Sequence, residues 1–454
     1  MTHHSYMKKL LLILTGLLFT AAVFAQQNTT NAPVYNFSLA DCINYAYQHQ
    51  DTVLNAGLDV KSAEYKVKET TGIGLPQING SASFLDYVKI PTTLIPGEFI
   101  GQPGTYIPLK FGVKYQSNVG VNGSQILFDG SYLVGLKASR TYKELSQRNF
   151  TRSKVEANVQ VTKAYYQVLA AGQRIKLLDS NLNQLKETLT QTRAQNKQGF
   201  VEKIDVDRLD VQYNDVLITR DNSLRLLGLA YQMLKFQMGM PIEATLILKD
   251  KLEDVKLDEA LNVGEADSLL YKNRIEYNLM ETQVKLNQLD LQRYKSQYLP
   301  TLSAVGNYTL SYQNNSFSQL YKNDFPSSYI GLQLNVPLFN GFQRSYRVKE
   351  AKIAVQKSQN DLENAKNGLN LAGQAAKISY MNGLQSLNSQ KHIRDVAHEV
   401  LRVAQIKYNQ GVGSSIEVIQ AETSLTQADD KYIQGLYEAL VSKVDLDRAY
   451  GRIQ

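Results

Sequence analysis

Apolar and polar residues alternate along four segments of the chain, and a period of two predicts β-strands. The expected strands cover residues of about 77–90, 111–128, 301–312 and 328–339. In the third segment the polar positions are mostly Ser, Thr and Asn, and the apolar positions are Leu302, Ala304, Tyr308, Leu310 and Tyr312. Each strand therefore has one apolar face and one face of small polar residues.

Strands of about ten residues with two such faces fit a sheet that lies between lipid and a water-filled lumen. An ordinary two-sheet sandwich of a soluble protein is the alternative. Aromatic residues gather where a barrel meets the surfaces of a bilayer, so tyrosines in or beside the strands favour the membrane. They are Tyr87, Tyr115, Tyr308, Tyr312 and Tyr329.

Four long proline-free segments predict four long helices. They cover about 131–198, 201–238, 342–410 and 415–450. None of the ten prolines lies between Lys110 and Met240 or after Pro337. The helix 131–198 would measure ~100 Å at 1.5 Å per residue, which is longer than a globular domain of this size needs. We expect the helices to form two antiparallel pairs, each joined by a short turn.

The last two of these helices carry a seven-residue pattern of large and then small residues. After Gly413 the large positions are Val418, Leu425, Tyr432, Ala439 and Leu446, and three places after each lie Ala421, Ala428, Gly435, Ser442 and Ala449. Such a seam lets helices approach closely, and a repeat of 3.5 residues bends the pair into a left-handed supercoil. The first pair shows the pattern less regularly.

The chain repeats itself. Leu338 to Gly341 (Leu-Phe-Asn-Gly) matches Leu127 to Gly130 (Leu-Phe-Asp-Gly) at a shift of 211, and Gly411 matches Gly199 at a shift of 212. The pair Leu75-Pro76 recurs as Leu299-Pro300. Duplication on this scale predicts two similar halves, which we place at 26–239 and 240–454 after a leader at 1–25.

Glycines mark the ends of the long helices in each half. Gly130 and Gly341 stand at the expected strand-to-helix junctions. Gly199, Gly411 and Gly413 stand at the turns between paired helices, where a left-handed residue can end one helix and reverse the chain. We expect all three turn glycines to adopt that conformation.

Shorter segments complete the outline. Ser38 caps a short helix, and helices are expected at about 51–71 and 275–298. The stretch 91–110 is rich in Pro and Gly and predicts a loop, for which 313–327 is the shorter counterpart. Residues 241–264 contain a short strand-like stretch, 245–248. They are expected to form a belt partway along the long helices, followed by a short helix at 263–273.

Composition restricts the location and chemistry. Met7-Lys8-Lys9, an apolar run and Val23-Phe24-Ala25 form a secretory signal peptide, and Gln26 after the cleavage site argues against lipidation. The formal charge of +7 is spread without a basic run, which argues against nucleic acid as a partner. No apolar stretch of ~18 residues lies outside the leader. The single cysteine, Cys42, reads as a buried small side chain.

No signature of catalysis is present. The chain has no phosphate-binding glycine loop, no HExxH zinc motif and no GxSxG elbow. His392 and His398 are six positions apart and cannot share a helix face as i, i+4 metal ligands would. We expect neither enzymatic activity nor a cofactor nor a metal site.

Four strands cannot close into a barrel, and an open sheet in lipid would leave unpaired backbone groups at several kcal/mol each. The strands are therefore expected to belong to a barrel shared between chains. Two chains would supply eight strands and a nearly filled interior, whereas three would supply twelve and leave a lumen. The sequence favours three or more chains without fixing the number.

The duplicated order of Leu-Pro, Leu-Phe-Asn/Asp-Gly and turn glycine resembles the TolC family of outer-membrane efflux proteins over essentially the whole mature chain. The resemblance implies a mainly α fold with β: four transmembrane strands per chain in a trimeric twelve-stranded barrel, continued by a coiled-coil α-helical barrel across the periplasm. It also implies a homotrimer in outer-membrane lipid, a periplasmic adaptor, and a proton-driven (RND-type) or ATP-driven (ABC-type) inner-membrane transporter.

In family members acidic and tyrosine side chains at the helix tips narrow the pore and select cations. The resemblance carries these roles to Tyr408 and Glu417, counted from Gly411, and to Asp205, counted from Gly199. A second acidic position of the family falls on Gln420, which departs from the pattern. Glu417 has another explanation, because residues 414–417 read as a capping box and an acid is favoured in the first turn of any helix.

Two other classes remain open. A soluble periplasmic coiled-coil scaffold would explain the heptads but not the alternating strands, and a passive porin or receptor would explain the barrel but not ~100 Å of helix. The cargo cannot be read from the sequence, since a lumen of small polar residues is permissive. Drugs, metals, lipids and secreted polypeptides are all compatible with it.

Overall fold

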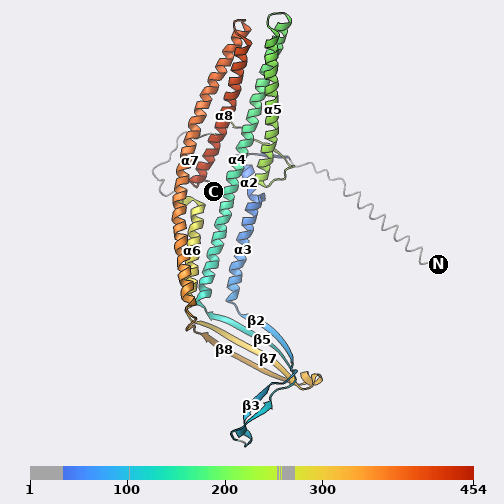
Figure 1. Cartoon of the computed structure of the whole chain (residues 1–454), viewed down its shortest axis with the longest axis vertical. Helices are drawn as coiled ribbons and strands as arrows, with labels where there is room; N and C mark the ends of the chain where they lie inside the picture. Colours follow the sequence, from blue (N-terminus) through green and yellow to red (C-terminus); the bar gives the residue numbers. More distant parts are fainter. Residues whose placement is uncertain (1–33, 102, 253–254, 256, 258–270, 454) are drawn as a thin grey trace, which may run out of the picture.

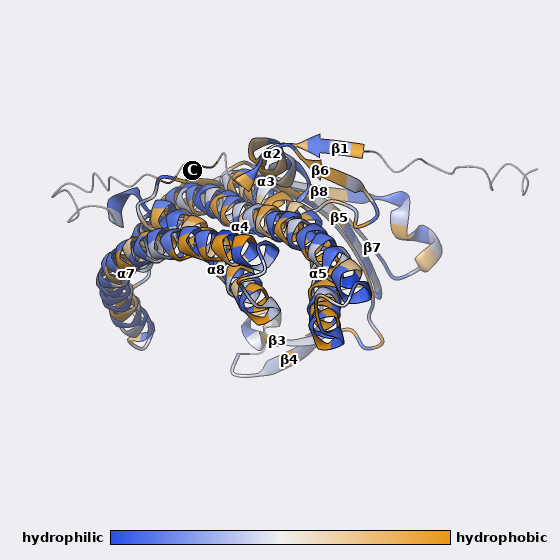
Figure 2. Cartoon of the chain, turned by 90° about the horizontal axis from the view of Figure 1, so that it is seen from above, coloured by the Kyte–Doolittle hydropathy of each residue, from blue (hydrophilic) through white to orange (hydrophobic). Residues whose placement is uncertain are grey.

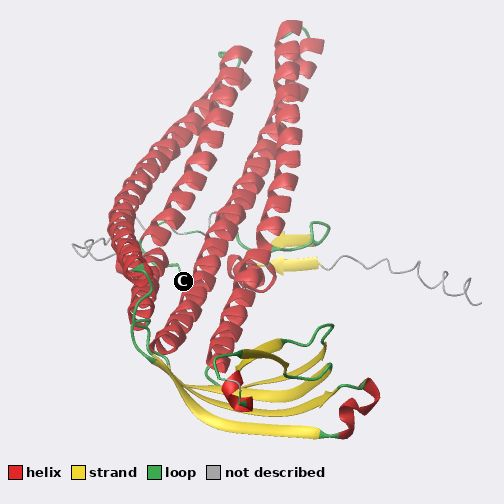
Figure 3. Ribbon diagram, turned by 60° about the horizontal axis from the view of Figure 1, so that its bottom comes forward, coloured by secondary structure: helices red, strands yellow, loops and turns green. Residues whose placement is uncertain are grey.

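The computed structural model describes residues 34–252 except 102, residues 255 and 257, and residues 271–453. The fold is a bundle of long helices with a twisted sheet at one end (Figure 1). Figure 3 shows the same division, with the turns of the two long helix pairs at the end away from the sheet. The expected leader at 1–25 lies outside the described residues.

Four antiparallel strands form the sheet at the base of the helices. They are β2 (Gln77–Asp86), β5 (Tyr115–Phe128), β7 (Thr301–Asn314) and β8 (Asp324–Asn335), and they lie in the order β2-β5-β7-β8. Strand β5 starts later than the expected residue 111, because Gly112, at a φ of 129°, interrupts the extended chain. Strand β8 lies four residues earlier in the chain than the expected 328–339. It ends before Pro337, which lacks the N–H that a ladder needs.

The strand register sorts the side chains by polarity. Val121 lies opposite Tyr308, and Ala304 lies opposite Leu332, so apolar residues of neighbouring strands share one face. Asn122 lies opposite both Asn79 and Asn307 on the other face. The alternation read from the sequence is therefore continuous across the sheet. Tyr329 is an exception to the expected aromatic girdle, because it pairs with Asn307 and lies on the polar face.

The apolar face is exposed to solvent in the isolated chain. Ile330 is 94% exposed and Leu332 is 71% exposed, and further exposed side chains on this face are Ile78, Phe84, Val119, Val121, Tyr308 and Leu334. Exposed apolar patches of this extent mark a surface that contacts a membrane or a partner. No helix in the described ranges is long and apolar enough to cross a bilayer.

The stretch 91–110, predicted as a loop, contains a separate hairpin of β3 (Thr92–Pro96) and β4 (Tyr106–Lys110). A one-turn 3-10 helix, η1 (Gly97–Ile100), lies between them. The Pro and Gly residues misled the prediction, because a two-stranded ribbon has only edge strands and edge strands tolerate proline. In the second half the corresponding connection holds η4 (Phe317–Lys322).

Seven α-helices are described. The four long ones are α4 (Gly130–Lys197), α5 (Lys203–Met238), α7 (Gln343–Asn409) and α8 (Ser415–Ala449). The shorter ones are α2 (Leu39–His49), α3 (Asp51–Ile73) and α6 (Ile275–Ser296). Seen along the bundle, the long helices form an arc with α5 and α7 at its two ends (Figure 2). The hairpin β3–β4 lies beyond the sheet, at the end of the molecule away from the turns of the long helices (Figure 1).

The heptad seam of α8 is the core of its pairing with α7. Nine of its ten predicted seam positions are buried, and Tyr432 is half-buried. Val418, Ala421, Leu425 and Ala428 pack against Ala397, Leu401 and Ala404 of α7. On the other side of the arc, leucines of α4 pack against Leu209 and Val216 of α5. Small residues at every second seam position allow this close approach.

A small parallel pair of strands crosses the bundle partway along. The stretch 245–248 forms β6 (Thr245–Leu248), and its partner β1 (Val34–Phe37) was not predicted. Cys42 lies in the core beneath them, and burial raises the pKa of its thiol to about 12, so the thiol is unreactive at neutral pH. The predicted helix at 263–273 lies outside the described residues except for 271–273.

The same core supports a stability prediction. Leu234 of α5 is completely buried against Val161, Tyr165 and Met238. Leu234→Ala should destabilise the chain by about 2–5 kcal/mol through lost burial and a cavity. Thermal unfolding of the purified protein would show a midpoint several degrees lower, while Leu226→Ala, at an exposed position of the same helix, should shift it far less. Equal shifts for the two variants would contradict the core assignment.

Candidate functional site

The turns that join the long helices, here called the helix tips, hold the three residues that the family resemblance places where the pore narrows: Asp205, Tyr408 and Glu417. The α4–α5 connection turns at Gly199 and the α7–α8 connection turns at Gly411, with φ values of 79° and 74°. In each turn the N–H of the residue after the glycine donates a hydrogen bond to a carbonyl of the preceding helix. Phe200 donates to the Gln195 carbonyl at 3.0 Å, and Val412 donates to the Lys407 carbonyl at 3.0 Å. Both glycines therefore end their helices as predicted.

Gly413 was expected to be left-handed, and this is wrong. Its φ is not positive, and glycine is required there for a different reason. A Cβ at this position would lie 2.9 Å from the Lys407 Cβ and 3.0 Å from the Tyr408 backbone nitrogen. The chain passes so close to the end of α7 that no side chain fits.

At the base of the helices, the two junction glycines differ. Gly130 is the first residue of α4, and Asp129 caps the helix by accepting hydrogen bonds from Ser131 and Tyr132. Gly341 has a φ of 64° and is followed by Phe342, the only described residue other than glycine with a positive φ. The helix α7 begins one residue later.

Tyr408 joins two helices at the tips. Its hydroxyl lies 3.0 Å from the Thr192 Oγ1 of α4, and Thr192 is completely buried. The hydroxyl of Thr192 also bonds the Thr188 carbonyl at 2.9 Å. The tyrosine therefore connects the α7–α8 pair to the α4–α5 pair through a desolvated contact.

Asp205 makes a second contact between the pairs. Its carboxylate accepts a hydrogen bond from the hydroxyl of Ser415, the first residue of α8, which is buried. Arg208 lies 3.6 Å from the same carboxylate, one turn further along α5. The structure thus holds Asp205 in a contact between helices and offsets part of its charge.

Glu417 is exposed and stands apart from the two contacts. Its backbone N–H donates to the Ser414 Oγ at 3.3 Å, which supports the capping explanation for this segment. Its side chain lines a groove of 450 Å³ between α7 and α8, together with Glu399, Lys407 and Gln420. The structure brings Tyr408 to Thr192 and Asp205 to Ser415, and it places Glu417 at neither contact.

Further contacts between the helix pairs lie deeper along α8 and were not predicted. The Asn181 amide donates to the Thr426 Oγ1 at 2.7 Å, and Arg174 pairs with Asp430 at 2.8 Å. Each pair is separated by more than 240 residues in sequence. From the sequence one could see only a polar residue at a position that faces another helix. Its partner on that helix could not be predicted.

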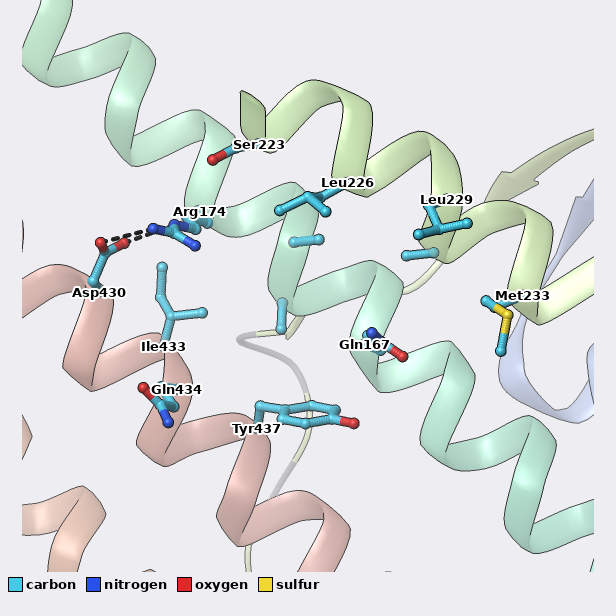
Figure 4. A pocket seen from close by; sticks show the side chains of 13 residues that line it. Gln167, Arg174, Ser223, Leu226, Leu229, Met233, Asp430, Ile433, Gln434 and Tyr437 are labelled. Carbon is cyan, nitrogen blue, oxygen red and sulfur yellow. Dashed lines mark hydrogen bonds and ion pairs between the residues drawn. The ribbon is translucent and has the colours of Figure 1, made fainter. Parts of the chain in front are cut away.

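Arg174 and Asp430 lie at one end of a pocket of 470 Å³ between α4, α5 and α8 (Figure 4). Leu226, Leu229 and Met233 of α5 line one side, and Ile433 and Tyr437 of α8 line the other. The pocket therefore lies between the two helix pairs, and its walls are mainly apolar with one ion pair. Among the described residues no group of three or more His, Cys, Asp or Glu side chains could hold a metal ion.

The model of the family described as "Outer membrane efflux protein" matches residues 42–222 and 294–452. The chain belongs to this family. The resemblance to TolC proteins inferred from the duplicated motifs is thereby confirmed, and the chain is an outer-membrane protein of the transport class.

Individual relatives and structures agree with the family assignment. The chain is 23% identical over 444 residues to the outer membrane protein TolC of Vibrio cholerae, covering 95% of this chain and 94% of that protein. It is 20% identical over 332 residues to the proteases secretion protein PrtF of Dickeya chrysanthemi, covering 72% and 71%. The fold matches the open state of the MtrE outer membrane channel of Neisseria gonorrhoeae with a TM-score of 0.74 at 17% identity, over 91% and 88% of the chains.

Proposed function

We propose that the chain is the outer-membrane channel of a tripartite efflux or secretion system and that it works as a homotrimer. The single observation that carries the proposal is a four-stranded sheet with an exposed apolar face at the base of ~100 Å helices. Lipid of the outer membrane would cover that face, and the helices would extend into the periplasm. A signal peptide at 1–25 would direct export.

The edges of the sheet support the trimer. Strands β2 and β8 each pair on one side only, so both edges leave backbone N–H and C=O groups without partners in this sheet. Each unpaired group in hydrocarbon costs several kcal/mol, so the edges must meet other strands before the sheet enters lipid. Three copies would pair β8 with the next β2 and close a twelve-stranded barrel.

The polar face supports a hydrated lumen. Asn118 lies at the centre of a polar row that runs across three strands. Its amide donates to the Ser83 Oγ at 3.4 Å, and its carbonyl oxygen accepts from the Ser311 Oγ at 2.8 Å. These side chains satisfy one another and leave small groups toward water, as the interior of a conducting barrel requires.

The ends of the helical arc support the same assembly. On α5 the exposed apolar residues Ile204, Val211 and Ile218 recur every seven positions, and on α7 Leu371 and Ile378 do the same. These helices lie at the two lateral edges of the arc (Figure 2). Rows with this period are half of a coiled-coil seam, and a neighbouring copy would supply the other half.

The two halves, 26–239 and 240–454, are proposed to be structural repeats. Each contributes two sheet strands and one long helix pair, and each pair ends at a turn glycine. Three chains with two repeats would place six similar helix pairs around one axis. Such an arrangement would form a tunnel whose wall is built from similar helix pairs all the way round.

The proposed partners follow from what the chain lacks. No nucleotide-binding or other energy-coupling motif occurs in the sequence, so transport would draw on an inner-membrane transporter of RND or ABC type through a periplasmic adaptor. The relatives include a proteases secretion protein and an efflux pump outer membrane protein, which supports a channel of broad cargo. The pump would select the cargo.

Asp205, Tyr408 and Glu417 are proposed to form the periplasmic constriction. Three copies of the two acids would give a ring of negative charge at the tips, attractive to divalent cations. Glu417→Gln combined with Asp205→Asn should weaken divalent-cation block of single-channel current in planar bilayers by tenfold or more. Glu438→Gln, an exposed acid far down α8, is the control. Unchanged block would remove both acids from the constriction.

The function itself is tested in cells. A strain without this chain should accumulate a fluorescent dye and become drug-sensitive, and a plasmid copy should restore export. Passive uptake of small nutrients should not change. A loss of nutrient uptake with normal dye export would instead indicate a passive porin.

A further inference from the structure

Helix α8 contains two buried carboxylic acids that take part in none of the contacts described above. Glu422 and Asp429 lie seven residues apart and are each 5% exposed. Seven residues are nearly two helical turns, so the two side chains lie in one row along the helix. A buried acid row inside a helix seam is costly unless each group is paired or neutral.

The row lies where α8 meets two other helices at once. Val418, Ala421 and Leu425 pack against α7. Ile419 packs against the α4–α5 cluster, and Thr426 bonds Asn181 of α4. At 100° per residue, positions 422 and 429 fall between these two faces of α8. The acids therefore point toward the junction of α7, α8 and α4.

Three of the four carboxyl oxygens lack a hydrogen-bond partner within the described residues. Both oxygens of Glu422 and the Oδ1 of Asp429 are buried without a partner, and so are the Arg394 Nε and the Gln390 Oε1 on α7. An ionised carboxylate in this position would leave a charge out of contact with water and with donors. A protonated acid fits this packing better.

The surrounding charges act unequally on the two acids. Burial raises the pKa of Glu422 to about 7, and the Gln405 amide of α7 opposes this only in part. Burial also raises the pKa of Asp429, and His398 and Arg394 of α7 oppose it, while the neighbouring Asp430 adds to it. From α4, Arg174 is engaged by Asp430. Glu422 therefore titrates near neutral pH.

We propose that Glu422 and Asp429 form a proton-controlled lock that holds α8 against α7 and α4 when the two acids are neutral and releases it when they ionise. The proposal rests on the channel function above, because separation of α8 from these neighbours would loosen the contacts at the helix tips. The lock is distinct from the tip contacts of Tyr408 and Asp205, which do not involve the two acids.

The direction of the pH effect follows from the raised pKa. An exposed glutamate has a pKa of about 4.3, so the closed state binds the proton of Glu422 more tightly than an open, hydrated state would. The resulting stabilisation of the closed state is complete below that value and is lost as the pH rises through about 7. The channel should therefore be more closed in acid and more open in mild alkali.

Single-channel recording of the trimer in planar bilayers tests the lock. Between pH of about 5.5 and 8, the open-to-closed ratio of the wild type should rise by roughly tenfold or more, because the pKa of Glu422 in each chain is raised to about 7. Glu422→Gln mimics the neutral acid and should remain mostly closed over this range. Glu438→Gln, at an exposed position of the same helix, should keep the wild-type profile.

A second measurement keeps the lock and the channel function separable. The thermal midpoint of the wild type in detergent should fall as the pH rises from about 6 to 8, and this fall should be absent in Glu422→Gln. A wild-type pH profile in Glu422→Gln combined with Asp429→Asn, in both measurements, would overturn the lock. A protein with no conductance at any pH would contradict the channel, and the thermal profile would still decide the lock.

Discussion

Leu332→Arg is expected to abolish assembly in the outer membrane, whereas Gln333→Arg is expected to be tolerated. The two residues are neighbours on β8 and lie on opposite faces of the sheet: Leu332 pairs with Ala304, and Gln333 pairs with Ser303. Leu332 belongs to the exposed apolar face. Arginine facing lipid costs about 2–4 kcal/mol at the bilayer midplane, and a trimer carries that cost three times.

The measurement is the amount of each variant recovered as trimer from outer-membrane fractions. Leu332→Arg should be degraded or remain unassembled, and Gln333→Arg should reach near wild-type levels with altered ion selectivity. Because the positions are adjacent, effects on translation and export are matched. The opposite pattern would mean that the assignment of the two faces is reversed.

Removing both tip contacts should produce a channel that is open most of the time. Tyr408→Phe deletes the hydroxyl that reaches Thr192, and Ser415→Ala deletes the hydroxyl that donates to Asp205. Each hydrogen bond contributes about 0.5–1.5 kcal/mol net, and three chains lose two each. The sum is large enough to shift a gating equilibrium by at least tenfold, since about 1.4 kcal/mol corresponds to that factor.

Single-channel current in planar bilayers should show the double variant in its high-conductance state at voltages where the wild type is nearly closed. Thr190→Ala combined with Ser424→Ala is the matched control, because both hydroxyls bond only a carbonyl of their own helix. The control should gate like the wild type. If the double variant also gates normally, the contacts at the tips do not hold the closed state.

The sequence was most informative where one pattern extends over many residues. The period of two located the sheet strands, because lipid on one side and water on the other impose opposite polarities on alternate residues. The absence of proline located α4 and α7 to within one or two residues. The heptad of α8 identified its buried seam, since a supercoiled pair buries the same positions in every turn.

Local turn chemistry was less reliable. Pro96 and Pro108 suggested a loop, yet they are accommodated in the two-stranded hairpin β3–β4. Gly413 suggested a left-handed residue, yet it is needed for close approach to Lys407. A glycine or a proline satisfies several different backbone requirements, and only the surrounding chain decides which one applies.

The partners of the candidate gate residues could not be predicted. Tyr408 and Thr192 are separated by 216 residues, and Asp205 and Ser415 by 210. Their contact depends on the supercoil of two helix pairs about each other, which the local pattern does not specify. Glu422 was missed for a related reason: a charged residue at a position between two seam faces reads as solvent-exposed until the third helix is placed.

The central claim is that four strands per chain require copies of the same chain to complete a barrel. The most direct test is the mass of the mature protein, purified in detergent, by light scattering corrected for bound detergent. The account predicts a stable particle of three chains at every concentration at which the protein remains folded. A folded, stably monomeric protein would contradict it.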